Sequence, residues 1–215
     1  MTPKIIKQLI AIAENRQMKD DPSHDFEHVY RVYLMAVKIG KSVNADLDVV
    51  IPAALFHDTV VYRKDSPESL NEANESAEVA GDILNSIKKY PKEKIDDVKT
   101  CIRECSFTKG IQAELLESKV LQDADLLESV GALSIMRTFS SCGHMNRPFY
   151  NKKHPFYEKY EKNFPSGIGL FYRRLLAVES RLHTKMAKKI GKQRTLFLKK
   201  FLLQVEKELK ESGVI

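Results

Sequence analysis

Apolar residues recur every three to four positions along most of this 215-residue chain, a spacing that predicts an all-α fold. The third predicted helix starts at Asp46 and carries an apolar run over residues 51–56 that leads directly into His57 and Asp58. Residues 59–62 are β-rich, but four residues are too few for a confident strand, so they are interpreted as the exit from this helix. The stripes that mark the predicted helices span residues 6–13, 29–39, 47–55, 73–87, 95–105, 115–136, 175–190 and 197–209.

Residues 140–168 break this pattern, because they combine Ser-Ser-Cys-Gly with three prolines. Two basic amphipathic helices are then expected over residues 168–211. The chain has no repeat, low-complexity tract or linker. A single domain over residues 1–215 is therefore predicted, with a motif-bearing core at 24–128 and an irregular segment at 140–168.

The charge distribution places the basic excess at the C-terminus. The net charge is +6, and residues 168–215 hold 12 Lys+Arg against 4 Asp+Glu. Such a tail can meet phosphates or nucleic acid, although a solvated helix face explains most of its lysines. Three cysteines form an odd, sparse set, which indicates a reducing compartment and predicts a cytoplasmic protein. Neither a signal peptide nor an apolar stretch of 18 residues is present, so no membrane association is expected.

The doublet His57-Asp58 requires an explanation, because burying a charge is costly unless it is paired or bound to a metal. A purely structural explanation is also open: His57 would be a core histidine with its hydrogen bonds made, and Asp58 would be a helix-end or turn residue. A second pair of histidines, His24 and His28, lies four residues apart and therefore projects from one helix face. Such a pair can share a metal, or one histidine can bind the metal while the other faces substrate.

Two carboxylates, Asp123 and Asp125, interrupt a third apolar segment. They are two residues apart, so a helix cannot aim both at one point. Imidazoles and carboxylates together suit Mn, Fe, Ni, Zn or Mg rather than a soft-metal site. A different metal site is also conceivable, because Cys101, Cys105, Cys142 and His144 are residue types that bind structural zinc. Their spacing lacks the C-x-x-C pair typical of such sites.

Three motifs follow one another in order: His28-Val-Tyr-Arg-Val32, Ala54-Leu-Phe-His57-Asp58 and Ala124-Asp125-Leu-Leu-Glu128. With them, residues 24–128 resemble the HD superfamily of metal-dependent phosphohydrolases. The stretch that begins at Phe171-Tyr-Arg-Arg resembles the C-terminal part of small bacterial members, with a less specific match. The resemblance implies a single HD-type helical domain.

The resemblance also implies a divalent metal ion, one of Mn, Mg, Fe, Ni, Co or Zn, held by His28, His57, Asp58 and Asp125. Asp123 then supports a ligand or competes with Asp125 for that role. His24 is similar to the first histidine of the His-Asn-x-x-His segment in cyclic-nucleotide phosphodiesterases, which faces substrate as a general acid. Binuclear members add histidines between the second and third motifs, and this chain has none between His57 and His144, which favours one metal. Where relatives often carry His-Ser, this chain has Cys105-Ser106.

The function implied is hydrolysis of a phosphoester or phosphoanhydride, with a nucleotide as the expected substrate, by attack of metal-bound water. Asp58 would serve the chemistry as well as the metal, with His24 as the acid. Three cations are candidates to bind phosphate: Arg31, Arg63 and Lys64. Arg31 can equally pair with a ligand carboxylate.

Two other functions remain open from the sequence. One is a degenerate HD module that senses a nucleotide without cleaving it. The other is a helical protein that binds nucleic acid through its basic tail, for which the chain lacks a recognisable docking motif and any tryptophan. The expected partner is therefore a small phosphorylated substrate rather than nucleic acid, and homo-oligomers stay open.

Overall fold

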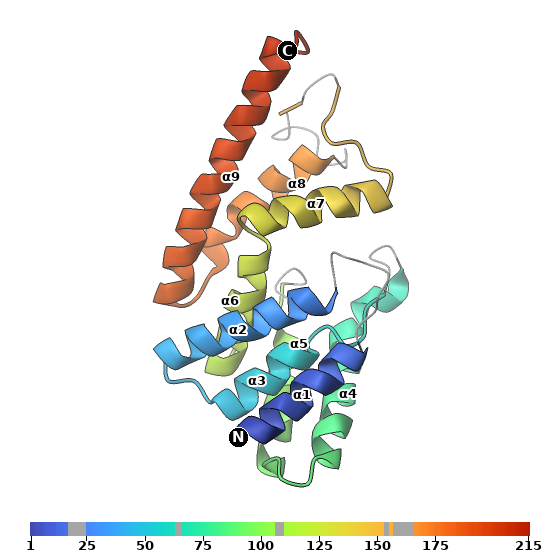
Figure 1. The fold of residues 1–215 in the computed structure, drawn as a ribbon, viewed down its shortest axis with the longest axis vertical. Coiled ribbons are helices and arrows are strands. Elements are labelled where there is room, and N and C mark those ends of the chain that lie inside the picture. Colours follow the sequence, from blue (N-terminus) through green and yellow to red (C-terminus); the bar gives the residue numbers. More distant parts are fainter. Residues whose placement is uncertain (17–24, 63–65, 106–109, 153–154, 157–165) are drawn as a thin grey trace. The chain divides into compact units, whose positions relative to one another are not determined.

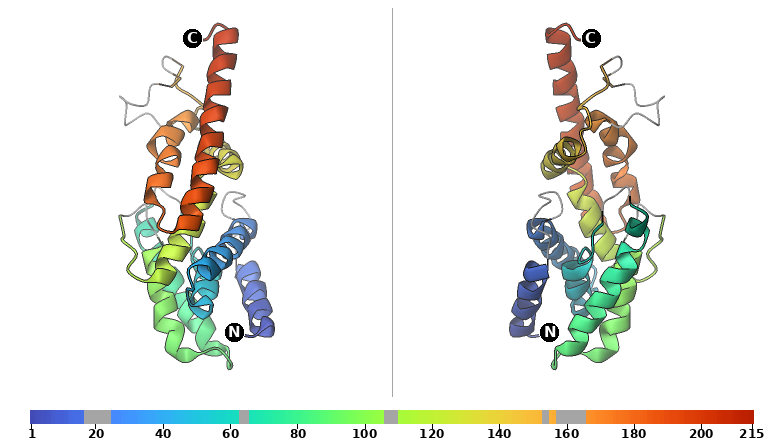
Figure 2. Two further views of the ribbon diagram at one scale, coloured as in Figure 1. Left: turned by 90° about the vertical axis from the view of Figure 1, so that its left-hand side faces the viewer. Right: turned by 90° about the vertical axis from the view of Figure 1, so that its right-hand side faces the viewer.

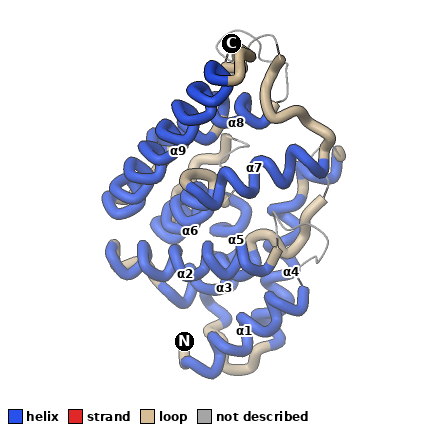
Figure 3. Tube along the Cα trace, turned by 45° about the horizontal axis from the view of Figure 1, so that its top comes forward, coloured by secondary structure: helices blue, strands red, loops and turns tan. Residues whose placement is uncertain are grey.

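The computed structural model describes residues 1–16, 25–62, 66–105, 110–152, 155–156 and 166–215 (Figure 1). Within these ranges every regular element is a helix, which confirms the predicted all-α class (Figure 3). The α-helices are α1 (Pro3–Arg16), α2 (Phe26–Ser42), α3 (Leu47–Phe56), α4 (Glu72–Ser86), α5 (Ile95–Glu104), α6 (Leu116–Glu128), α7 (Ala132–His144), α8 (Gly167–Arg173) and α9 (Lys185–Glu211). The described residues also include the 3₁₀ turns η1 (Pro67–Leu70), η2 (Lys92–Lys94), η4 (Leu175–Ala177) and η5 (Glu179–Arg181).

The chain forms two compact units, Met1–Asp125 and Leu126–Ile215. The sequence of α6 runs through the boundary, so this helix contributes Asp125 to the first unit and Leu127 to the second. The single domain expected over residues 1–215 stays a prediction.

Helix α3 is the centre of the first unit. Every residue from Val49 to Phe56 is buried, and α3 packs against α1, α2, α4 and α5 (Figures 1 and 2). An apolar helix with no polar face is stable only when other elements cover it on all sides. Because α3 is covered on all sides, the residue that follows it, His57, is also placed inside the unit.

Pro52 lies inside α3 and lacks the N–H that would bond to the carbonyl oxygen four residues earlier, at Asp48. The hydroxyl of Tyr90 donates to that oxygen at 2.8 Å. Burial, followed by the charge of Asp48, raises the pKa of Tyr90, so the hydroxyl keeps its proton and remains a donor. The proline is therefore accommodated without an unsatisfied carbonyl inside the core.

Side-chain caps fix where the two helices before the site begin. Asp25 accepts the backbone N–H of His28 at 3.1 Å and starts α2. Asp46 accepts the N–H of Asp48 at 2.9 Å and starts α3, as the sequence predicts. Lys94 also donates to Asp46 at 2.6 Å. Each helix therefore enters the core at a start position set by a carboxylate.

The second unit is organised around an aromatic cluster on α7, α8 and α9. The ring centroid of Phe139 lies 5.3 Å from that of Phe149 and 6.0 Å from that of Phe171. Phe171 in turn stacks on Phe201 at 5.6 Å. The close approach of α8 to α7 requires Gly167, because a Cβ there would lie 2.6 Å from the Phe139 ring.

The stripe predicted as one helix over residues 115–136 is two helices, α6 and α7. Gly131 separates them, with φ of 102° and ψ of −165°, a conformation essentially restricted to glycine. The guanidinium of Arg194 donates to the Leu127 carbonyl at 2.5 Å, beside the end of α6. The turn is thus held by a residue 67 positions away, which the local pattern does not reveal.

The C-terminal part also differs from the two amphipathic helices expected over residues 168–211. Residues 175–181 form two 3₁₀ turns, and the backbone at Leu182 is extended. Thr184 then accepts the N–H of Ala187 at 3.2 Å and starts the single long helix α9. A capping threonine within the apolar stripe therefore interrupts the expected helix. Regular helix also reaches His144 and resumes at Gly167, inside the segment expected to be irregular.

Among the described helices, none is both long and apolar enough to cross a membrane.

Candidate functional site

His28 belongs to the first turn of α2 and is buried, with 1% of its surface exposed. The Asp25 carboxylate receives the backbone N–H of His28, so the cap that starts the helix also fixes the backbone of this histidine. The imidazole consequently points into the unit rather than to solvent. His24, expected on the same face, lies outside the described residues.

His57 follows the last residue of α3, and its ring is almost completely buried. Its Nδ1 lies 2.8 Å from the carbonyl oxygen of Ala54, which can only accept, so Nδ1 carries the proton and donates. In the neutral imidazole Nε2 then presents a lone pair, and among the described residues it has no hydrogen-bond partner. A buried polar atom without a partner is rare and points to an absent ion or water. A backbone carbonyl orienting the other ring nitrogen is also typical of metal-binding histidines.

Two carboxylates lie close to the histidines. Asp58 Oδ2 is 3.7 Å from His28 Nε2 and 3.5 Å from His57 Nε2. Asp125 Oδ1 is 3.5 Å from His28 Nε2. One ligand atom from each of His28, His57 and Asp125 falls within 4.8 Å of the others. The first unit thus brings together residues from α2, the end of α3 and α6.

These separations fit atoms arranged around a common cation. Direct hydrogen bonds between imidazole and carboxylate are about 2.7–3.2 Å long, shorter than the three imidazole–carboxylate distances here. Atoms that each lie about 2.1 Å from one ion are roughly 3–4 Å apart. Two carboxylates also supply the charge that a divalent cation neutralises. The side chains can therefore hold a metal ion.

The remaining candidates differ in what the structure says of them. Asp123 is completely buried on α6 and is not part of the metal-compatible group, whereas Asp125 is. Arg31 is half-buried on α2, one turn after His28. Arg63 and Lys64 lie outside the described residues. Their binding of phosphate stays a prediction.

The rival cysteine site has no counterpart among the described residues, where the metal-compatible group contains no cysteine. Cys105 is buried, and burial, followed by the charges of Asp125 and Asp58, raises the pKa of its thiol. It therefore remains a neutral thiol beside the two carboxylates.

The Ala54 carbonyl is the functional group that the sequence did not reveal. It carries no side-chain signal, and only its place three residues before His57 in a helix could have suggested the bond. This carbonyl fixes which nitrogen of His57 is protonated and so orients the ring within the site.

Comparisons with known proteins agree with this geometry. The family model of the HD domain matches residues 25–129. YpgQ of Bacillus subtilis strain 168 is 30% identical over 196 residues, which cover 88% of this chain and 86% of YpgQ. The crystal structure of YpgQ in complex with ADP superposes with a TM-score of 0.72 at 27% identity, covering 98% of this chain and 100% of that one. An HD-superfamily hydrolase from Bacillus thuringiensis gives 0.74 at 26% identity, covering 96% of this chain and 97% of that one.

Sequence, fold and the convergence of His28, His57 and Asp125 thus lead to one conclusion: this chain belongs to the HD superfamily.

Proposed function

We propose that this protein is a metal-dependent phosphohydrolase that cleaves a phosphoester or phosphoanhydride of a nucleotide. The observation that carries the proposal is the buried Nε2 of His57, which has no hydrogen-bond partner in the described part of the chain and lies beside the Asp58 carboxylate. Packing alone gives no reason to bury a nitrogen lone pair without a donor. A cation held by His28, His57, Asp58 and Asp125 supplies that reason.

A divalent ion in this position would lower the pKa of a bound water and polarise a phosphoryl oxygen. His28 and His57 would present neutral nitrogens to it, and the two carboxylates would balance its charge. Four protein ligands leave room for water and substrate on an octahedral ion.

Asp58 has a second role in the proposal. Its side chain is one-third exposed, whereas those of the two histidines are almost fully buried. It can therefore face both the ion and the solvent from which the attacking water comes. We propose that Asp58 orients that water and accepts its proton.

Substrate binding is proposed to depend on cationic side chains. Arg31, one turn from His28, is proposed either to clamp a phosphate or to pair with a ligand carboxylate. Arg63 and Lys64 are proposed to bind phosphate, with His24 as the acid for the leaving oxygen. The ADP complex of YpgQ is the observation in a relative that favours a nucleotide.

The test begins with protein purified without added metal, which is analysed for metal content and then assayed with Mn, Mg, Fe, Co, Ni and Zn. The substrates are nucleoside mono-, di- and triphosphates, cyclic nucleotides and p-nitrophenyl phosphate. We expect turnover of at least one nucleotide with one of these ions, and its loss in Asp58→Asn. The Asp82→Asn variant, on α4 away from the cluster, serves as a matched control.

A different outcome would select an alternative. Tight nucleotide binding without turnover for any ion would identify a sensing module. Absence of bound metal together with tight, salt-resistant binding of nucleic acid would favour the basic tail as the functional surface.

A further inference from the structure

The segment directly after Asp58, residues 59–62, is held by side chains of α4. This segment is called the strap below. The N–H of Val60 donates to the Ser76 hydroxyl at 3.0 Å, and the N–H of Tyr62 donates to Glu72 Oε1 at 2.7 Å. These are backbone groups, so the bonds fix the path of the main chain rather than the packing of one side chain.

A third bond closes the same contact. The Tyr62 hydroxyl donates to Glu75 Oε2 at 2.7 Å, and Asn71 donates to the other oxygen of Glu75 at 2.9 Å. The hydrogen bond from Tyr62, followed by that from Asn71, lowers the pKa of Glu75, which keeps it a carboxylate acceptor at neutral pH. Glu72, Glu75 and Ser76 are three and four residues apart, so they share one face of α4.

The other end of the strap is anchored to α3. Both the N–H and the hydroxyl of Thr59 donate to the Phe56 carbonyl, at 3.3 and 2.9 Å. Asp58 therefore lies between two fixed points, the end of α3 and the face of α4. Its carboxylate must stay within 3.5–3.7 Å of the two imidazoles if it is to share their cation.

We infer that Tyr62, Glu75 and Ser76 are positioning residues for the metal site, acting through the strap on Asp58. This inference rests on the proposed function. A shift of about 1 Å in a residue of a reacting site can cost about 100-fold in rate, so the path of the main chain just after a ligand matters. Ser76 is completely buried and bonds to both the N–H and the carbonyl of Val60, whereas Tyr62 and Glu75 are partly exposed and can be altered without opening the core.

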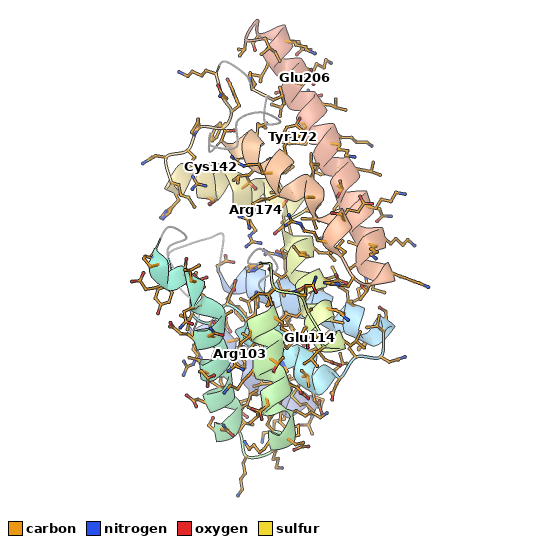
Figure 4. All side chains as sticks on the ribbon, turned by 180° about the vertical axis from the view of Figure 1, so that it is seen from behind. Arg103, Glu114, Cys142, Tyr172, Arg174 and Glu206 are labelled. Carbon is orange, nitrogen blue, oxygen red and sulfur yellow. The ribbon has the colours of Figure 1, made fainter. Side chains whose placement is uncertain are left out.

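The experiment uses the full chain after removal of metal. Tyr62→Phe deletes one hydroxyl, Glu75→Ala deletes its acceptor, and Glu75→Gln retains an acceptor oxygen. The matched control is Glu78→Ala, one turn further along α4. Glu78 forms ion pairs with Lys99 and Arg103 of α5 and makes no bond to the strap. Arg103 is labelled in Figure 4.

Two readouts separate positioning from general stability. Calorimetric titration with Mn²⁺ measures metal affinity, and hydrogen exchange of the metal-free protein reports on residues 57–62. We expect Tyr62→Phe and Glu75→Ala each to weaken Mn²⁺ binding about tenfold, the lower end of the range for residues that orient metal ligands, and to speed exchange in the strap. Glu75→Gln should behave as the wild type does, and the double variant should be no weaker than either single one.

The outcomes distinguish this inference from the proposed function. If the wild type binds Mn²⁺ and Tyr62→Phe and Glu75→Ala bind it equally well, the metal site stands and the positioning role is wrong. Equal weakening by Glu78→Ala would also refute the role, because the effect would then come from α4 as a whole. A wild type that binds no divalent ion would remove the proposed function and, with it, the role of the strap.

Discussion

Replacing His57 by leucine separates a metal ligand from a core histidine. Leucine is apolar and similar in size, so the variant leaves the buried Ala54 carbonyl without its imidazole donor, which costs about 1–3 kcal/mol. It also removes the buried Nε2 that lacks a partner, which relieves a penalty of about 1–3 kcal/mol. The two effects nearly cancel, and the metal-free variant should be about as stable as the metal-free wild type.

Added metal should then distinguish the two proteins. An ion present at about 100 times its Kd stabilises the folded state by about 2.7 kcal/mol. For a chain of this size that corresponds to a rise in Tm of roughly 5–11 °C. We expect this rise in the wild type and none in His57→Leu.

The assay is thermal unfolding with EDTA and with excess MnCl₂, with His144→Leu as control, since this exposed histidine ends α7 in the second unit. An equal Mn²⁺-dependent shift in His57→Leu would refute the assignment of His57 as a ligand. A metal-free variant that melts more than about 10 °C below the wild type would show that the histidine acts chiefly in the core.

Three further predictions concern the scaffold. Gly131→Ala should lower the free energy of unfolding in urea by about 1–3 kcal/mol, because φ is 102° and a Cβ would lie 3.1 Å from Arg194. The control Gly110→Ala, with φ of 76° and open space around it, should cost less, and the reverse order of the two losses would contradict this prediction. Phe171→Ala should cost about 3–5 kcal/mol by the same measurement, since its ring is fully buried, whereas Phe197→Ala, about half exposed, should change little. Burial alone would raise the pKa of Asp46, but hydrogen bonds from Lys94 and the Asp48 amide outweigh it and lower the pKa below its usual 3.8. A lowered pKa in the folded state adds stability that is present above pH about 4 and is lost as the pH falls further. Stability should therefore fall less steeply on acidification in Asp46→Asn than in the wild type. If the urea midpoint changes equally in the two proteins between pH 6 and pH 3, this prediction is wrong.

The sequence determined the helical class and the start of α3, because apolar periodicity and capping residues are local signals. Asp46 before an apolar run predicts the start of α3, and the structure confirms it. The doublet His57-Asp58 could be singled out for the same reason, since two polar residues at the end of a buried helix conflict with their surroundings. Local signals do not predict helix ends that depend on backbone conformation or on residues far away in the sequence. The turn at Gly131 depends on its backbone conformation and on Arg194, and the break before α9 depends on Thr184 capping a new helix.

Only the tertiary structure could decide which polar residues meet. Apolar periodicity does not separate Asp123 from Asp125, and the family resemblance favours Asp125. In the structure Asp123 is fully buried outside the metal-compatible group, whereas Asp125 lies 3.5 Å from His28. The backbone carbonyl of Ala54 binds Nδ1 of His57, and residue types in the sequence do not indicate such a contact. The bonds from α4 to the strap likewise join residues 10–16 positions apart, two of them through backbone N–H groups and one through the Tyr62 hydroxyl. Periodicity fixes which face of a helix is buried, whereas the distance between two faces depends on how the helices pack.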